Sequence, residues 1–378
     1  MPRSAFQLGI ERLCAQPAQL RGQRVGLIAH PASVDTAGVH SSVRLRQACG
    51  KKLVAFLGPE HGFYGRGGAG EEIGDARHLA WDIPIYSLYG DHRKPTAAML
   101  AGVDTVVFDL QDIAVRCYTF VTTLRYVMES CAEQGKRLIV CDRPVPLPNT
   151  VDGPLPSPGF DSFVAGVPVP LVYGMTPAET ALFLKRALHL QLDLTIMPLR
   201  AFQRSAQRSA SPWISPSPGI RYWETTWTYP ITVFTEALPA LDCGRGGTEP
   251  FQVLTAPFFE AESLARALNA RRLPGVQFIP YWNRQPGVRL HVTDPDTLRP
   301  CAAALHLLEV VQRLYGPERL WSAPGTRPEW FDKLMGTDAP RLLLQTGKSI
   351  RPWLKKVDCQ LADFQALREK ALLYPRPA

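Results

Sequence analysis

The stretch Leu53-Val-Ala-Phe-Leu-Gly-Pro-Glu-His-Gly62 decides the fold class of this chain. Its first five residues are apolar and do not alternate with polar ones, which is typical of a strand covered on both faces. Glycine and proline then end the strand at a turn that carries Glu60 and His61. A buried strand that runs directly into a polar turn indicates the carboxyl end of a strand in a parallel sheet, where open α/β sheets bind their ligands.

Further short apolar runs with helical segments between them extend this pattern. The expected strands are residues 25–29, 105–109, 137–141 and 192–197, and the expected helices are residues 41–48, 118–134 and 176–188. The last of these helices opens with Thr176-Pro-Ala-Glu179, a capping-box pattern with proline at the first helical position. Alternating strands and helices predict right-handed crossovers and a Rossmann-like parallel sheet.

The pattern changes after a Ser- and Pro-rich segment at residues 203–219, which indicates a domain junction. Beyond it, residues 276–281 and 287–292 read as strands and residues 300–314 as an amphipathic helix. A chain of 378 residues also exceeds the usual size of one compact core. We therefore expect an α/β protein with a Rossmann-like catalytic domain at 1–200 and a smaller α+β domain at 201–378 that closes the cleft.

Composition excludes several classes of protein. The apolar fraction is 46% and the charged fraction 20%, which are values of a globular domain. The net charge of +8 is scattered over the chain, so we expect no nucleic-acid partner. No apolar run reaches the roughly 18 residues of a membrane span. The first residues lack the apolar core of a signal peptide, which predicts a cytoplasmic protein unless the start codon is mis-assigned.

Metal and cofactor sites are not expected. The eight cysteines form no Cys-x-x-Cys pair. His61, His78 and His92 have no metal-ligand spacing, so a metal-dependent hydrolase is only a rival hypothesis. The Gly-rich segment at residues 65–70 lacks the spacing of phosphate-binding loops, and a flexible loop is the favoured interpretation.

Carboxylates and arginines follow three of the expected strands and should converge at one edge of the sheet. Glu60 is either a general acid or the partner of an arginine, Arg66 or Arg143. Asp109 and Asp112 are either catalytic or structural, with Asp109 capping the backbone and Asp112 pairing with Arg116. The convergence itself predicts a functional site at this edge.

Several segments resemble the NamZ-type exo-β-N-acetylmuramidase family of peptidoglycan hydrolases. The matching segments run in family order from about residue 25 to about residue 260. They are Leu57-Gly-Pro-Glu-His-Gly-Phe63, Ile85-Tyr-Ser-Leu-Tyr-Gly90, Lys94-Pro-Thr96, Phe108-Asp-Leu-Gln-Asp-Ile113 with Arg116 and Tyr118-Thr-Phe120, Asp142-Arg-Pro144, Asp152-Gly-Pro154, Gly174-Met-Thr176 with Glu179, and Gly244-Arg-Gly246 with Thr248. The chain departs from the family pattern at His30-Pro31, Val172-Tyr173, Gly219 and Cys243.

The resemblance implies a glycoside hydrolase that releases N-acetylmuramic acid from the non-reducing end of peptidoglycan fragments, with a small saccharide or muropeptide as its partner. Glu60 would be the general acid, and Asp109, Asp112 or the substrate's own acetamido group would be the second participant. The expected substrate-binding residues are His61, Arg66, Gln111, Arg116, Tyr118, Arg143, Tyr173 and Arg245. The departures leave a non-catalytic or divergent saccharide-binding protein on the same fold as the alternative.

Overall fold

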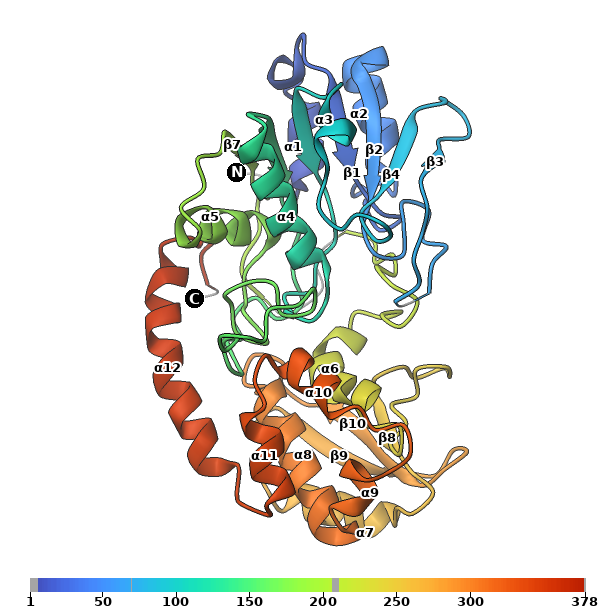
Figure 1. Cartoon of the computed structure of the whole chain (residues 1–378), viewed down its shortest axis with the longest axis vertical. Helices are drawn as coiled ribbons and strands as arrows, with labels where there is room; N and C mark the ends of the chain where they lie inside the picture. The colour runs from blue at the N-terminus through green and yellow to red at the C-terminus, as the bar shows by residue number, and fades with distance from the viewer. Residues whose placement is uncertain (1–5, 69, 206–210, 377–378) are drawn as a thin grey trace.

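The computed structural model describes residues 6–68, 70–205 and 211–376. Its first part is a seven-stranded sheet with the order β3-β4-β2-β1-β5-β6-β7, shown in the upper half of Figure 1. The strands are β1 (Val25–Ile28), β2 (Leu53–Gly58), β3 (Ala76–Arg77), β4 (Pro84–Ser87), β5 (Thr105–Phe108), β6 (Arg137–Cys141) and β7 (Leu194–Met197). All neighbours pair in parallel except β3 with β4. The predicted α/β fold with a Rossmann-like parallel sheet is therefore confirmed.

Helices cover both faces of this sheet. They are α1 (Gly9–Cys14), α2 (Ser41–Cys49), α3 (Ala97–Leu100), α4 (Phe120–Glu133) and α5 (Pro177–Ala187), and η1 (Pro17–Leu20) and η2 (Gly50–Lys52) are short 3-10 turns. Val107 and Ile139 pack in the cluster that contains the residues of α1 and α2, whereas Val106 and Val140 pack in the cluster that contains those of α4 and α5. Successive strand residues thus face opposite layers, which explains the unbroken apolar runs.

The second part of the chain holds a three-stranded antiparallel sheet, β8-β10-β9, in the lower half of Figure 1. Its strands are β8 (Val253–Thr255), β9 (Val276–Tyr281) and β10 (Gly287–Val292). Its helices are α6 (Thr225–Thr232), α7 (Ala261–Asn269), α8 (Pro300–Tyr315), α9 (Glu318–Trp321), α10 (Pro328–Met335), α11 (Ala339–Gln345) and α12 (Arg351–Glu369), with the 3-10 turn η3 (Val233–Ala237) after α6. This α+β unit also matches the expected fold class.

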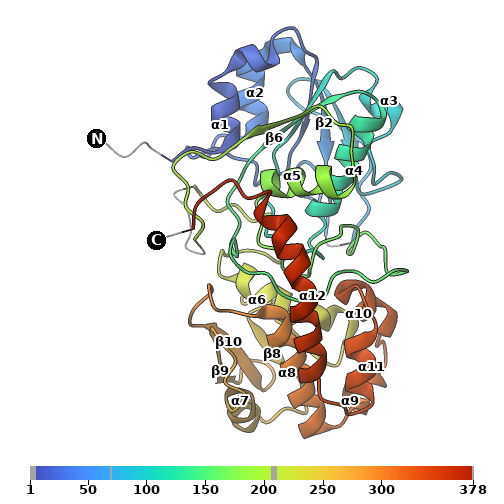
Figure 2. The same cartoon turned by 90° about the vertical axis from the view of Figure 1, so that its left-hand side faces the viewer.

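Two arginines join the two parts of the molecule. Helix α12 runs along one side of the molecule from the lower part to the upper part, as Figure 2 shows. Near its end, Arg368 is buried and donates hydrogen bonds to the carbonyl oxygens of Pro148 at 2.9 Å and Gly174 at 2.7 Å. In the other direction, Arg116 reaches from the upper part to the carbonyl of Met335 at 2.6 Å. Arg116 thus bonds to carbonyls of both parts, and Arg368 fixes the end of α12 to the upper part, so the two parts are held in a defined position.

Candidate active site

A cavity of about 470 Å³ lies between the two parts of the chain. Its size is that of a small-molecule site. The upper wall comes from the loops after β2, β4, β5 and β6, and the lower wall comes from residues 217–251, Arg327 and helix α10. The lining residues are Glu60, His61, Gly70, Tyr89, Cys117, Tyr118, Thr119, Val164, Ser217, Pro218, Gly219, Arg221, Tyr229, Glu236, Arg245, Phe251, Arg327, Trp330 and Leu334.

Glu60 enters the cavity because the chain turns sharply after β2. The amide of Gly62 donates to the carbonyl of Pro59 at 2.8 Å, and His61 adopts a positive φ of 70°. Gly58 is required at the end of the strand, because a Cβ there would lie 2.5 Å from the amide nitrogen of Phe63. The backbone therefore aims the side chains of Glu60 and His61 away from the strand and into the cavity.

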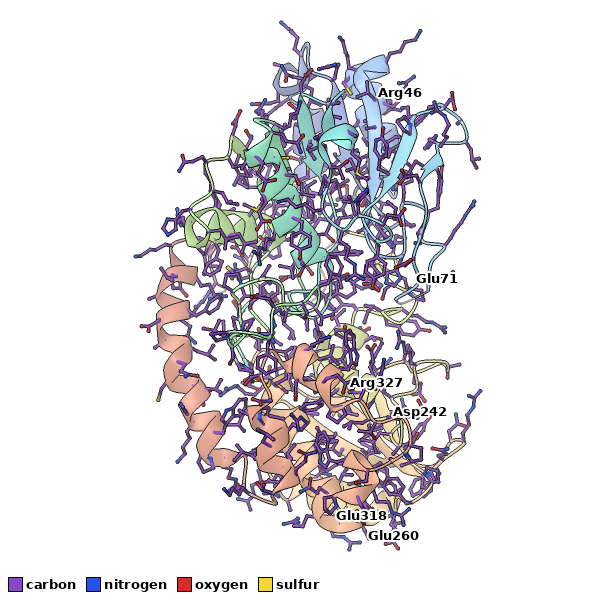
Figure 3. All side chains as sticks on the ribbon, in the orientation of Figure 1. Arg46, Glu71, Asp242, Glu260, Glu318 and Arg327 are labelled. Atoms are coloured by element: carbon purple, nitrogen blue, oxygen red, sulfur yellow. The ribbon has the colours of Figure 1, made fainter. Side chains whose placement is uncertain are left out.

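Hydrogen bonds hold both oxygens of the Glu60 carboxylate. The hydroxyl of Thr119 donates to Oε2 at 2.6 Å, and the amide of Gly70 donates to Oε1 at 2.9 Å. Thr119 directly precedes α4. Gly70 is the last residue of the Gly-rich segment, and the next residue, Glu71, is labelled in Figure 3. Among the residues that the structure describes, no ion pair to Glu60 is found, so the alternative in which it pairs with Arg66 or Arg143 is wrong. A half-buried carboxylate fixed in this way is suited to proton transfer.

Aromatic rings and arginines form the rest of the wall. The rings of Tyr118 and Tyr229 meet edge to face with centroids 6.3 Å apart, and Tyr118 donates to the carbonyl of Pro216 at 2.7 Å. Burial, with the charge of Glu60 second, raises the pKa of Tyr89 to about 12, so its hydroxyl stays protonated as a donor. Arg327, labelled in Figure 3, lies on the side of the lower part that faces the upper one. Flat rings with polar rims and fixed cations suit an acidic sugar.

The predicted site residues separate into two groups. Glu60, His61, Tyr118 and Arg245 line the cavity. Seven others do not: Asp109, Asp112, Arg66, Gln111, Arg116, Arg143 and Tyr173. Most of these seven are buried side chains that link the loops at the sheet edge to each other, so the sheet-edge rule located the region but not the side chains that reach the cavity.

Asp109 and Arg143 form a buried ion pair. The Nε of Arg143 donates to Asp109 Oδ1 at 2.6 Å, its Nη2 donates to Oδ2 at 2.8 Å, and neither side chain is more than 2% exposed. Asp109 also accepts a hydrogen bond from Ser41. Both oxygens of the carboxylate therefore accept hydrogen bonds, and these join the end of β5 to the loop after β6 and to the start of α2.

Asp112 is anchored in a different way from the one expected. It accepts hydrogen bonds from the Tyr173 hydroxyl and from the amide of Ile113 at 2.7 Å. Burial raises its pKa to about 6. The structural alternative in which Asp112 pairs with Arg116 is wrong, because Arg116 donates instead to backbone carbonyls, including Pro154 at 2.7 Å. Complete burial without a charged partner lowers the pKa of Arg116 to about 10.

The two remaining candidates also lie outside the cavity wall. Gln111 donates from Nε2 to the carbonyls of Asp112 at 2.9 Å and Pro144 at 2.8 Å, which ties the loop after β5 to the loop after β6. Arg66 is exposed and lies over the ring of Tyr64 at 5.2 Å. Both are contacts within the upper part.

Glu236 is the functional candidate that the sequence analysis missed. Its carboxylate lines the cavity and pairs with Arg245 at 3.0 Å between Oε1 and Nη1. Burial raises the pKa of Glu236, and the charge of Glu60 raises it further, while Arg245 and Arg327 lower it. A signal was present, because Glu236 is the one charged residue in the segment 225–241. An isolated acid within an apolar segment marks a buried carboxylate.

Three of the departures from the family pattern lie in or near the cavity wall: Gly219, Cys243 and His30. Gly219 lines the wall, and Cys243 is buried two residues before Arg245. His30 is buried with its ring 6.2 Å from that of His61, and burial lowers its pKa to about 3, which keeps it neutral. Within the described ranges, no cluster of three or more His, Cys, Asp or Glu side chains could hold a metal ion. The same residues contain no helix long and apolar enough to cross a bilayer.

Comparison with known proteins shows the family to which this chain belongs. A family model for the N-terminal part of exo-β-N-acetylmuramidase NamZ matches residues 25–224, and a model for the C-terminal part matches residues 227–374. The chain is 35% identical to the peptidoglycan β-N-acetylmuramidase NamZ of Bacillus subtilis (strain 168), over 97% of this chain and 91% of the relative.

Solved structures agree with this relationship. A DUF1343 family protein from Bacteroides fragilis NCTC 9343 superposes with a TM-score of 0.89 at 32% identity, covering 99% of this chain and all of the other. A second DUF1343 family protein of the same organism gives a TM-score of 0.74 at 25% identity, again over 99% of this chain and all of its own.

Proposed function

Because this chain belongs to the exo-β-N-acetylmuramidase NamZ family, we propose that it removes N-acetylmuramic acid from the non-reducing end of peptidoglycan fragments. The observation that carries the proposal is the Glu60 carboxylate, which is fixed by Thr119 and Gly70 within a cavity of saccharide size. In this proposal Glu60 protonates the glycosidic oxygen as the bond to the anomeric carbon breaks.

The arginines of the lower wall support an acidic sugar as the substrate. Arg245 and Arg327 line the cavity, and Glu236 is the carboxylate beside them. The Nη2 of Arg327 donates to the backbone carbonyl of Glu236 at 2.6 Å, which leaves other N–H groups of its guanidinium available. A guanidinium binds a carboxylate through two parallel hydrogen bonds, so these side chains would hold the lactyl carboxylate of N-acetylmuramic acid.

Product analysis tests this function directly. The purified chain is incubated with a disaccharide that carries N-acetylmuramic acid at its non-reducing end, with the reversed disaccharide, and with longer peptide-free fragments. We expect free N-acetylmuramic acid from the first substrate, none from the second, and one-sugar shortening of the third in mass spectra. Internal cleavage of the long fragments would contradict the exo action. Binding of the first disaccharide without hydrolysis would favour the saccharide-binding alternative.

A further inference from the structure

Two carboxylates reach the cavity, and they come from different parts of the fold. Among the described lining residues the acids are Glu60, which follows β2, and Glu236, which belongs to η3. The neighbours of Glu236 in η3, Val233, Phe234 and Ala237, are buried. The rings of Phe234 and Phe331 also pack with centroids 5.2 Å apart. Glu236 is thus held on a packed turn and presented to the cavity across from the Glu60 loop.

We propose that Glu236 is the second catalytic carboxylate of this site, ionised in the resting enzyme and stabilising the positive charge that develops on the anomeric carbon. The assignment rests on the proposed function. It replaces Asp109 and Asp112, whose oxygens are occupied by buried partners outside the cavity wall. Hydrolysis through an oxocarbenium-like transition state ordinarily uses a pair of carboxylates on either side of the scissile bond.

Neighbouring cations and burial act in opposite directions on the Glu236 carboxylate. Arg245 lies 3.0 Å away and Arg327 is fixed to the same turn, and both cations favour the charged form. Burial acts in the opposite direction, as does the negative charge of Glu60 while that residue is ionised, and the pKa of Glu236 is raised overall. The other titratable groups coupled to Glu236 are Tyr89, Cys117, Tyr229 and Cys243, and burial raises the pKa of each, so they stay neutral.

Trp330 supplies a further feature of a binding wall. It lines the cavity, and its buried indole N–H lies close enough to Glu236 to lower the pKa of that carboxylate. The guanidinium of Arg327 lies over this ring at 5.7 Å, which holds the ring in place beside the carboxylate.

The first test compares Glu236→Gln with a matched control. Glu249→Gln removes a carboxylate of equal burial from the same domain. Glu249 pairs with Arg289 and accepts a hydrogen bond from Tyr281 at 2.8 Å, outside the cavity wall. We expect Glu236→Gln to lower kcat on the disaccharide by roughly 10²–10³-fold, the usual effect of removing a group that stabilises transition-state charge. Glu249→Gln should stay within about threefold, and both variants should show the melting temperature of the wild type within a few degrees.

A pH profile separates a catalytic role from a structural one. If Glu236 must be ionised, kcat/KM of the wild type falls as the pH drops through the pKa of this carboxylate, which burial places above its ordinary value. Glu236→Gln should lose this acid limb, whereas Glu249→Gln should keep it. A residue that only supports the loop would lower activity equally at every pH.

Chemical rescue provides the sharpest result. With Glu236→Ala and a nitrophenyl β-glycoside of N-acetylmuramic acid, azide can occupy the space of the lost carboxylate. It then forms a bond to the anomeric carbon as nitrophenolate leaves. We expect azide to raise the rate at least tenfold and to yield the α-glycosyl azide, because the anion enters on the face opposite the leaving group.

Two outcomes would overturn the assignment while leaving the proposed function intact. One is a Glu236→Gln variant with near wild-type kcat. The other is an inactive Glu236→Ala variant that azide does not rescue, although wild type and Glu249→Gln release N-acetylmuramic acid. A wild-type protein that releases no sugar from the disaccharide would refute the proposed function, and the assignment with it.

Discussion

At the scale of single residues, Glu60→Gln isolates the role of the proton. Glutamine keeps the shape of the side chain. Its one carbonyl oxygen can accept from the Gly70 amide while its NH2 group donates to the Thr119 hydroxyl, but it has no acidic proton to give. We expect kcat on the disaccharide to fall by roughly 10²–10⁴-fold. The loss should shrink on a nitrophenyl glycoside, because that leaving group needs little protonation. Turnover is measured by release of N-acetylmuramic acid and of nitrophenolate.

Glu71→Gln is the control for Glu60→Gln. Glu71 directly follows the Gly-rich segment and accepts a hydrogen bond from the amide of Gly68 at 2.7 Å, but it is exposed and outside the cavity wall. We expect it to change kcat by less than about threefold. Full turnover by Glu60→Gln on the natural disaccharide would show that Glu60 is structural.

The buried pair of Asp109 and Arg143 should govern stability and not turnover. Asp109→Asn leaves the Arg143 guanidinium buried without its counter-charge, and we expect a loss of about 3 kcal/mol in the free energy of unfolding. The double variant Asp109→Leu with Arg143→Met removes both charges and should lose less. Urea unfolding gives the stability, and kcat per folded molecule should stay close to wild type. A folded Asp109→Asn protein with a 100-fold lower kcat would return this residue to the catalytic candidates.

The individual site residues show how far sequence reasoning reaches. Glu60, His61 and Tyr118 were identified because they follow strands whose carboxyl ends must meet at one edge. Asp109 obeys the same rule but lies beneath the loops, since the segment that follows it is buried throughout. Glu236 follows no strand of the parallel sheet. Its place in the cavity depends on how two domains pack, which no local pattern determines.

At the scale of elements, prediction succeeded where strands and helices carry local signals. Strands β1, β2, β5, β6 and β7 lie where apolar runs predicted them, and α5 has the predicted capping box, with the Thr176 amide donating to Glu179 Oε2 at 2.9 Å. The short strands β3 and β8 have too few residues for a recognisable period. Helix α6 contains Pro230, which argues against a helix in any single-sequence reading. Tertiary packing stabilises these elements.

Asp142, which binds the start of helix α5, should make the stability of the protein depend on pH. Asp142 accepts hydrogen bonds from the Ala178 amide at 2.9 Å and the Thr176 hydroxyl at 2.9 Å at the start of this helix. Burial, with the charge of Glu179 second, raises its pKa from 3.8 to about 7. The folded state therefore binds this proton more tightly than the unfolded state does. The stabilising effect is complete below about pH 4 and is lost as the pH rises to about 7.

Asp142→Asn tests this dependence, because an amide does not titrate. Relative to this variant, the wild type should lose melting temperature between pH 4 and pH 7, and the difference should be constant above pH 8. Scanning calorimetry at several pH values measures it. Parallel curves for the two proteins across this range would contradict the raised pKa of Asp142.

At the scale of the whole molecule, the cavity exists only while the two parts of the chain stay together. Its upper wall contributes Glu60 and its lower wall contributes Glu236 and Arg245. One hydrophobic cluster extends from Phe108 in the parallel sheet to Leu290 in the antiparallel one. The family models divide the chain between residues 224 and 227, whereas our expected boundary at residue 200 stays a prediction. Helix α12 then returns to the first domain, which a linear division of the sequence does not anticipate.

Arg116 offers the most direct way to loosen this joint. Its guanidinium donates to the carbonyls of Pro154 and Val169 in the upper part and to Leu334 and Met335 in the lower part. Arg116→Met keeps much of the buried volume but leaves these acceptors without a donor, at a cost of about 1–3 kcal/mol for each group that stays buried. We expect a single thermal transition for the wild type. Because the loss falls on the contacts between the two parts, this transition should broaden or split in Arg116→Met.

Ligand binding should reverse the splitting of the thermal transition in Arg116→Met. A sugar that touches both walls binds the assembled cavity and not its separated halves. In calorimetry, the disaccharide should merge the split transitions of Arg116→Met and raise the lower one. The calorimetry uses Glu60→Gln as the background so that the sugar is not consumed.

The kinetics of Arg116→Met with Glu60 intact give a second measurement. KM should rise more than kcat falls, because Arg116 lies outside the cavity wall and only positions Leu334, which lies in that wall. An unchanged single transition in Arg116→Met would place the cohesion of the molecule in the hydrophobic cluster alone.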